Sequence, residues 1–249
     1  IVFVRFFLIG ATMSISLGLY LFSTLFSPHT KSRGFRLRRN WAKLGCRILG
    51  IKNKFDGVAI TAPAIYAVNH RSLVDPMIIA PHIDAFVVSK AEVESYPVLG
   101  YGAALTGIVF VKREDKSSRS ATIQAMYEIL ERGDNVMIFP EGTTNLQQLT
   151  KIYKLGSFRV AADLGIPVVP VVLEYRDNKD LWNIDHVLPQ FAKQFGVWRT
   201  HTKMHIGPPF LGSDPEKLMT EVKEYTDKTL VEMHEGWSTM GFYERDDEV

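Results

Sequence analysis

The sequence predicts an α/β fold with a largely parallel central sheet flanked by helices, preceded by an N-terminal hydrophobic and amphipathic helical segment that anchors it to a membrane. From residue 55 onward, short β-like apolar runs alternate with segments of helical periodicity, which is typical of parallel sheets. Before them, an uncharged stretch is followed by a basic amphipathic one. We therefore divide the chain into membrane-associating helices at 1–54 and an α/β domain at 55–249.

The distribution of charge also separates the two parts. Residues 1–55 carry ten Lys and Arg and no Asp or Glu, whereas the remainder carries 19 Lys and Arg against 27 Asp and Glu. A basic arm on an acidic body is typical of proteins that bind a polyanionic surface, such as anionic lipid or nucleic acid. The single cysteine, Cys46, excludes an internal disulfide and a Cys-based zinc cluster.

The N-terminal part has two helical patterns. Residues 6–26 hold no charge and would form a helix of about 31 Å, the thickness of a bilayer core. A signal peptide is the alternative, which we disfavour because basic residues follow and no small-residue cleavage pattern does. Residues 35–51 carry an apolar helical stripe: Leu37, Trp41, Leu44 and Ile48. Cations line another face: Arg36, Arg39, Lys43 and Arg47.

Such a basic amphipathic pattern with a Trp predicts an interfacial membrane helix, the alternative being an ordinary helix packed on the core. Because the basic residues follow the apolar segment, they predict that this side faces the cytoplasm.

The α/β part reads as strands and helices in turn. We expect strands at residues 64–68, 84–88, 107–111, 135–139 and 168–175, and an edge strand at 203–206. Ser117 or Ser118 should cap a helix that ends at Gly133, and a second helix should span 153–164. Residues 213–216 read S-D-P-E, a capping box that opens a helix to about Glu235.

Residues 69–75, N-H-R-S-L-V-D, follow the first of these strands. His70 and Asp75 would lie about 140° apart around a helix, so a helix would not pair them. Pro76 disfavours helical backbone angles at Asp75 and suits the first helical position, so we expect a strand-to-helix loop. There Asp75 can bind one imidazole nitrogen and leave the other as a general base. The alternative is a loop whose side chains only cap a helix.

Three further stretches lie at strand ends. Residues 107–113 end in Lys112 and Arg113, which suit a phosphate, or are merely solvated cations at a strand terminus. Residues 139–145, F-P-E-G-T-T-N, predict a tight turn that gathers a carboxylate, two hydroxyls and backbone N–H groups, or a plain loop. Residues 166–171 hold two prolines, which imply an edge strand, a first strand residue or an irregular backbone.

Together these four stretches resemble the motifs of PlsC-type lysophospholipid and glycerophosphate acyltransferases, such as 1-acylglycerol-3-phosphate acyltransferases. The family motifs are N-H-x-x-x-x-D, G-x-x-F-x-x-R, F-P-E-G-T-R and a V-P-x-x-P-like strand. They correspond here to residues 69–75, 107–113, 139–144 and 166–171, and the resemblance spans residues 60–210. The order of the motifs is more specific than any one of them.

The resemblance implies a membrane-associated O-acyltransferase of phospholipid biosynthesis or remodelling. Such an enzyme moves a fatty acyl group from acyl-CoA or acyl carrier protein to a hydroxyl of a lysophospholipid such as lysophosphatidic acid. The thioester is a co-substrate, so no metal or cofactor is implied. For this chain we expect the inner (cytoplasmic) membrane, with the catalytic domain on its cytoplasmic face.

The resemblance also implies roles for single residues. His70 would be the catalytic base and Asp75 would orient it. Substrate contacts are expected from nine residues: Asn69, Ser72, Lys112, Arg113, Glu141, Gly142, Thr143, Thr144 and Lys154. One departure matters, since Thr144 stands where the third motif often has Arg. Because that Arg is associated with the acceptor phosphate, a lyso-ornithine lipid or a lysolipid with a larger headgroup becomes an alternative acceptor, and Lys154 could supply part of the missing charge.

Other classes of protein remain as alternatives. A thioesterase or lipid hydrolase could use the same His/Asp pair to activate water, and a non-enzymatic membrane scaffold would use only the basic helix. Nucleic-acid binding is disfavoured, because the positive charge lies beside an apolar segment and not among exposed aromatic side chains on a sheet.

Overall fold

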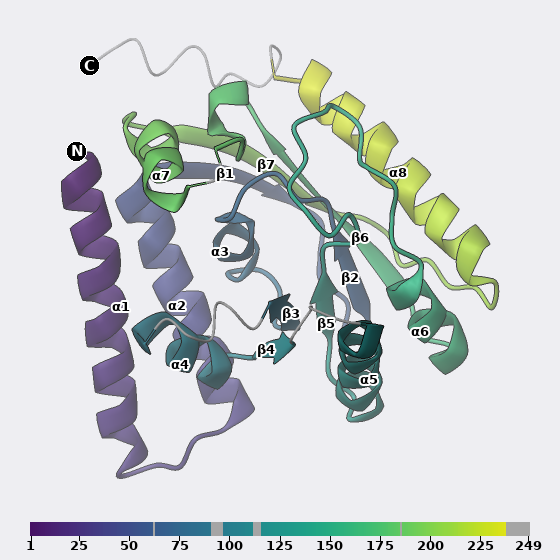
Figure 1. Ribbon diagram of the computed structural model, residues 1–249, viewed down its shortest axis with the longest axis horizontal. Coiled ribbons are helices and arrows are strands. Elements are labelled where there is room, and N and C mark those ends of the chain that lie inside the picture. The colour runs from purple at the N-terminus through teal and green to yellow at the C-terminus, as the bar shows by residue number, and fades with distance from the viewer. Residues whose placement is uncertain (62, 91–96, 112–115, 185, 238–249) are drawn as a thin grey trace.

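The computed structural model describes the chain except residues 62, 91–96, 112–115, 185 and 238–249. The described residues form one seven-stranded sheet with helices on both faces (Figure 1). The strands are β1 (Ile51–Asp56), β2 (Ile65–Val68), β3 (Phe86–Lys90), β4 (Ile108–Val111), β5 (Val136–Ile138), β6 (Val168–Tyr175) and β7 (Thr200–Ile206). The helices are α1 (Val2–Thr24), α2 (Lys31–Leu49), α3 (Asp75–Ile79), α4 (Pro97–Leu105), α5 (Lys116–Glu131), α6 (Gly156–Leu164), η2 (Asn178–Asp180, a 3-10 helix), α7 (Val187–Phe195) and α8 (Pro215–Glu235).

The strand order is β1-β7-β6-β2-β5-β3-β4. All neighbouring strands are parallel except β6 and β7, which are antiparallel. The predicted, largely parallel α/β fold is therefore confirmed. Because β2, β5 and β6 run in the same direction, the loops that follow them meet at one edge of the sheet.

Both faces of the sheet are covered, so its central strands β2, β5 and β6 are mostly apolar. Alternate residues of β2 point to opposite sides. Tyr66 and Val68 enter a core shared with α2, α3 and α7, whereas Ile65 and Ala67 enter a core shared with α5, α6 and α8. Residues 69–75, which hold the predicted His/Asp pair, thus follow a fully buried strand that supports them rigidly.

Helix α1 lies along α2 at the side of the molecule (Figure 1). Among the described residues, it is the helix that is long and apolar enough to cross a membrane by length and composition. Its outer face leaves many large apolar side chains exposed, including Phe3, Phe7, Ile15, Leu19 and Phe22. At its N-terminal end, the buried Arg5 guanidinium donates to the carbonyl oxygens of Phe195, Val197 and Trp198.

The sheet differs from the expectation at its β7 side. Residues 203–206 belong to β7, which is an interior strand between β6 and β1 and not an edge strand. The edge is β1, which was not expected because its sequence, I-K-N-K-F-D, is mostly polar. An edge strand needs to bury only part of its side chains, and the boundary expected between residues 54 and 55 falls inside β1.

Several helix ends also differ. Ser117 and Ser118 lie within α5 and not before it. Helix α6 begins at Gly156 and not at residue 153. Helix α8 is capped by Asp214 rather than Ser213, since the Asp214 carboxylate accepts the backbone N–H groups of Glu216 and Lys217. In α2 the fully buried apolar residues are Phe35, Ala42 and Leu49, whereas Leu44 of the predicted stripe is exposed. Helices α4 and α7 were not expected, because their apolar residues had no clear start signal.

Candidate active site

His70, in the loop that follows β2, meets Asp75, the first residue of α3, so the two side chains pair where the strand leads into the helix, as the spacing predicts. His70 Nδ1 lies 2.8 Å from Asp75 Oδ2. The Asp75 side chain is fully buried, and that of His70 is 14% exposed. Among the described residues, His70 Nε2 has no hydrogen-bond partner. The imidazole stacks on Phe139, with 4.1 Å between the ring centroids, so its plane is held from one side.

Asp75 is also held by neighbouring donors. Its Oδ2 accepts the backbone N–H groups of Arg71 at 2.7 Å and Ser72 at 2.9 Å, and its Oδ1 accepts the Tyr175 hydroxyl at 2.7 Å. Burial, and then the adjacent Asp75 carboxylate, raise the pKa of Tyr175 well above its ordinary value, so Tyr175 remains a proton donor. A carboxylate with this many donors is fixed in position beside Nδ1 of the imidazole.

Asn69 and Ser72 fasten this loop to β6 and α7 by hydrogen bonds. The Asn69 side chain is buried and exchanges two 2.8 Å hydrogen bonds with the backbone of Leu173 in β6. Ser72 is also buried, and its hydroxyl donates to Gln194 Oε1 of α7 at 2.9 Å. Both polar groups that we expected to bind substrate are thus engaged within the protein, where they position the loop.

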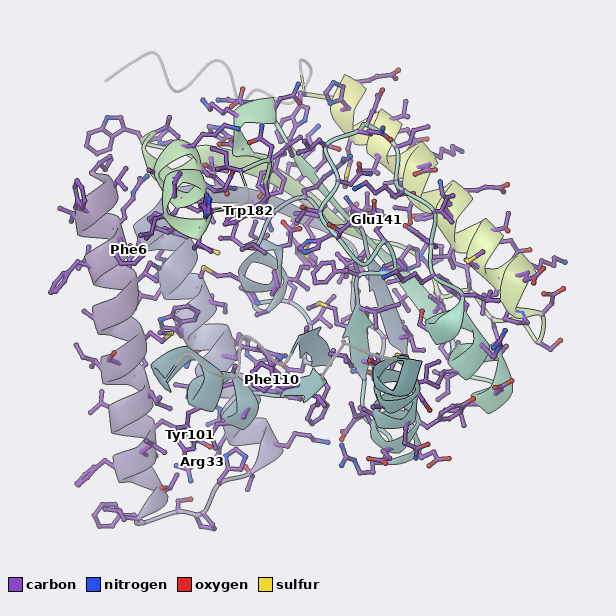
Figure 2. The ribbon with its side chains drawn as sticks, viewed as in Figure 1. Phe6, Arg33, Tyr101, Phe110, Glu141 and Trp182 are labelled. Atoms are coloured by element: carbon purple, nitrogen blue, oxygen red, sulfur yellow. The ribbon has the colours of Figure 1, made fainter. Side chains whose placement is uncertain are left out.

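Glu141 joins the third motif to the histidine loop. Its Oε1 accepts the backbone N–H of His70 at 2.9 Å, and its Oε2 accepts that of Lys151 at 2.8 Å. The backbone N–H of Asn145 also donates to the carbonyl oxygen of His70 at 2.7 Å. Glu141 is buried and lies among the loops between the sheet and α8 (Figure 2). The structure therefore brings the first and third motifs together, with Glu141 as the connection.

The turn after Glu141 depends on a glycine. Gly142 has φ of +73°, and a Cβ there would collide with the Lys154 side chain. The Lys154 ammonium therefore lies against this turn, beside the exposed Thr143. Thr144 is partly exposed, and its carbonyl oxygen accepts Lys151 Nζ at 3.0 Å. A cation is thus close to the position where the family motif has Arg.

The second motif is only partly described by the structure, and the fourth lies at β6. Strand β4 ends at Val111, and Lys112 and Arg113 lie outside the described residues. Pro170 lies inside β6, and its carbonyl oxygen accepts the N–H of Gly207. Strand β6 lies between β2 and β7, and its pairing with β7 begins only at Val171, so Pro170 does not mark an edge strand.

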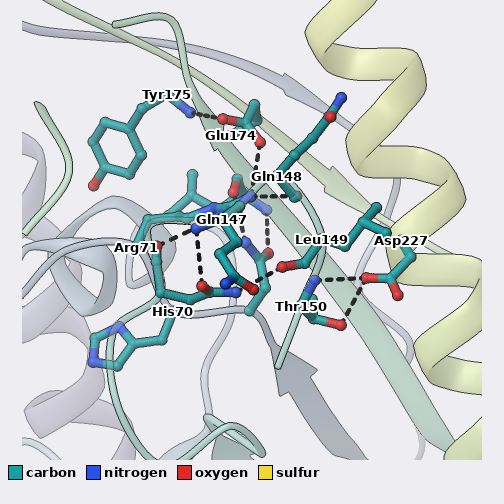
Figure 3. Close-up of polar contacts among 12 residues, drawn as sticks. His70, Arg71, Gln147, Gln148, Leu149, Thr150, Glu174, Tyr175 and Asp227 are labelled. Atoms are coloured by element: carbon teal, nitrogen blue, oxygen red, sulfur yellow. Dashed lines mark hydrogen bonds and ion pairs between the residues drawn. The ribbon is translucent and has the colours of Figure 1, made fainter. Parts of the chain in front are cut away.

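Sequence reasoning missed a buried ion pair beside the site. Arg71 Nη2 lies 3.2 Å from Glu174 Oε2, and the same guanidinium donates to the carbonyl oxygens of Asn145, Gln147 and Gln148 (Figure 3). Burial raises the pKa of Glu174, and Arg71 partly offsets this effect. Figure 3 shows the His70 imidazole turned away from this network. The position of Arg71 inside the first motif was the one available signal.

Comparison with known proteins identifies the family. A family model described as Acyltransferase matches residues 51–174, which include the His70/Asp75 loop, Glu141 and all but the last residue of β6. This domain belongs to the acyltransferase family. The predicted resemblance to this family is confirmed.

Among similar acyltransferases, the chloroplastic 1-acyl-sn-glycerol-3-phosphate acyltransferase of Arabidopsis thaliana is 30% identical over 159 residues, which is 61% of this chain and 44% of that protein. The lyso-ornithine lipid O-acyltransferase of Pseudomonas aeruginosa is 33% identical over 141 residues, 57% of this chain and 54% of that protein. The chain thus matches about half the length of these relatives.

A solved structure shares the fold. The crystal structure of the 1-acyl-sn-glycerophosphate acyltransferase PlsC from Thermotoga maritima superposes with a TM-score of 0.73 at 20% identity, covering 93% of this chain and 94% of that chain. The fold of that structure therefore extends over nearly the whole of this chain.

Proposed function

We propose that this protein is an acyltransferase that moves a fatty acyl group from a thioester to a free hydroxyl of a lysolipid at a membrane surface. The observation that carries the proposal is the His70/Asp75 pair, in which Asp75 engages Nδ1 and leaves Nε2 available for a substrate proton. Family membership and relatives named as acyltransferases of two different lysolipids support the same reaction class.

The reaction follows from this geometry. His70 Nε2 removes the proton of the lysolipid hydroxyl as its oxygen attacks the thioester carbonyl carbon. Asp75 holds Nδ1–H and stabilises the imidazolium that forms. When the tetrahedral intermediate collapses, the carbon–sulfur bond breaks and the imidazolium returns its proton to the leaving thiolate. Because the thioester is already activated, the proposal needs neither a covalent Ser or Cys intermediate nor a metal or prosthetic group.

The acceptor headgroup would lie over the turn after Glu141. Gly142 and Thr143 present small groups there, and the ammonium group of Lys154 lies against the turn. We propose that Lys154, together with Lys112 and Arg113 of the second motif, attracts the anionic part of the acceptor. Thr144 in place of Arg leaves three acceptors to compare, which are lysophosphatidic acid, lyso-ornithine lipid and a lysophospholipid with a larger headgroup.

We further propose that α1 lies in the membrane surface and does not cross the bilayer. The Arg5 side chain fastens the N-terminal end of α1 to the loop before β7. The other end packs on α2 and α4. Leu17 lies against Gly102 of α4, and Tyr20 hydrogen-bonds His29 in the segment that joins α1 to α2. A helix held to the domain at both ends cannot cross while the domain stays on one side, whereas its exposed outer face suits one leaflet.

The test is an acyl-transfer assay of the purified chain with one acyl-CoA and a panel of lysolipids. We expect CoA release that depends on the lysolipid, continues in EDTA and is lost in His70→Ala. Because His70 is partly exposed and Asp75 keeps its other donors, the variant should fold normally, which circular dichroism checks. The acceptor that gives the highest kcat/KM identifies the headgroup.

Two outcomes would overturn the proposal. Equal CoA release with and without lysolipid would indicate a thioesterase. Turnover of His70→Ala close to that of the unmodified chain would remove the assigned base.

A further inference from the structure

Helix α7 has two faces of opposite character. On the inner face, Gln194 Oε1 accepts the Ser72 hydroxyl, and Gln190 bonds to the backbone of the segment that precedes the helix. Both glutamines are fully buried. On the outer side, Val187 and Leu188 are 52% and 62% exposed, and Trp198 in the following 196–199 turn is 81% exposed. We call these three exposed residues the α7 patch.

The α7 patch is fixed beside α1. Arg5 of α1 donates hydrogen bonds to three carbonyl oxygens between Phe195 and Trp198. The Phe6 ring, near the N-terminal end of α1 in Figure 2, meets the Phe191 ring edge to face with 5.6 Å between centroids. Phe3 and Phe7 on the same part of α1 are 89% and 72% exposed. The apolar surface of α1 therefore continues onto the αβ domain.

The chemistry of this surface fits a lipid bilayer. Trp198 is followed by the exposed cation Arg199. A second exposed cation, Lys52, lies in β1 next to Ile51, and Ile51 pairs with Thr200, the residue after Arg199. Indole rings with flanking Lys and Arg are typical of the membrane–water interface, where the ring lies at headgroup depth and the cations meet anionic lipid. A contiguous apolar surface of this kind marks an interaction site.

We propose that the α7 patch is a second bilayer-contacting surface that acts together with α1. The proposal rests on the membrane placement of α1 proposed above. Two contacts, one on the N-terminal helix and one on the αβ domain, define the orientation of the domain on the membrane. Since Gln194 of the same helix holds Ser72, one side-chain hydrogen bond connects the lipid-contacting helix to the catalytic loop.

Site-directed labelling tests the contact directly. Leu188→Cys in a Cys46→Ala background would carry an environment-sensitive dye, and the full chain would be placed in nanodiscs of phosphatidylcholine and phosphatidylglycerol. Two controls match Leu188 in exposure: Leu19→Cys on the outer face of α1 and Leu211→Cys in the loop before α8, both 66% exposed. Helix α8 covers the face of the sheet away from α1 (Figure 1).

We expect nitroxide-labelled lipid to lower the emission of the dye at residues 188 and 19 about twofold, because interfacial elements enter the headgroup and acyl boundary. Emission at residue 211 should stay unchanged. Equal, weak quenching at residues 188 and 211 would overturn the α7 patch as a lipid contact, and absence of quenching at residue 19 as well would overturn the membrane placement of α1.

A change at residue 188 that follows protein concentration in lipid-free detergent would show that a second copy covers the patch, which also contradicts the proposal. Quenching is measured without turnover, so it tests the membrane contact independently of the acyl-transfer assay. A failure of the α7 patch proposal is therefore distinguishable from a failure of the proposed function.

Discussion

Tyr175 completes the support of the catalytic pair, although it lies 100 residues away from Asp75 along the chain. Its hydroxyl donates to Asp75 Oδ1 at 2.7 Å, on the oxygen that His70 does not use. The other donors to Asp75 come from its own loop, so Tyr175 ties that loop to the end of β6. Tyr175 is a positioning residue, since it acts on the base only through the carboxylate.

We expect Tyr175→Phe to lower kcat roughly tenfold with little change in KM, because a less constrained Asp75 misaligns the base without affecting substrate binding. Tyr66→Phe is the matched control, since the buried Tyr66 hydroxyl donates to the carbonyl oxygen of Ile60, away from the site. Steady-state kinetics of both variants would decide. Equal losses of kcat would mean that Tyr175 only stabilises the fold.

At the scale of elements, the loop after β5 is held to the loop after β2 by charge and by backbone hydrogen bonds. Arg71 binds three carbonyl oxygens of residues 145–148 and pairs with Glu174 at the end of β6. Thr150, farther along the same loop, donates its N–H and hydroxyl to Asp227 of α8 (Figure 3). Three elements thus converge on a segment with no regular structure.

Replacing Arg71 by Met should destabilise the fold by about 3 kcal/mol, because Glu174 is left as a buried, unpaired carboxylate. Adding Glu174→Gln should recover part of that loss, since the uncompensated charge is removed. Acyl transfer should stay low in the double variant, because residues 145–148 still lack their donor. Urea unfolding of the single and double variants measures the coupling. Strictly additive losses would contradict the assigned ion pair.

The sequence predicted elements and local pairings better than distant contacts. The spacing around Pro76 was enough to predict the His70/Asp75 loop, because both partners lie within six residues of each other. The parallel strands also followed from their apolar runs. By contrast, the partners Tyr175 and Gln194 could not be predicted, because each depends on how β6 and α7 pack against the loop. The edge strand β1 was missed because its sequence is mostly polar.

At the scale of the whole molecule, stability should depend on pH through Asp180. Asp180 is buried near Thr200, and burial raises its pKa to about 7. The folded chain therefore binds this proton more tightly than the unfolded chain does, where a carboxyl titrates near pH 4. The stabilisation is complete below about pH 4 and is lost as pH rises to about 7, by roughly 1 kcal/mol per pH unit.

Asp180→Asn should remove this dependence, so its Tm should fall less between pH 5 and pH 8 than that of the unmodified chain. Thermal unfolding of the full chain in a mild detergent provides the measurement. Glu221→Gln, at a partly exposed position on α8, is the matched control for loss of a carboxyl group. Parallel pH profiles for Asp180→Asn and the unmodified chain would show that another group is responsible.

The Arg5 contact has a practical consequence for anyone who shortens the protein to make it water-soluble. Removing α1 would also remove the donor for the carbonyl oxygens of Phe195, Val197 and Trp198. Those acceptors follow Gln194, which holds Ser72 in the histidine loop. A low turnover number for the shortened enzyme would then combine two losses, that of the membrane and that of a well-ordered catalytic loop.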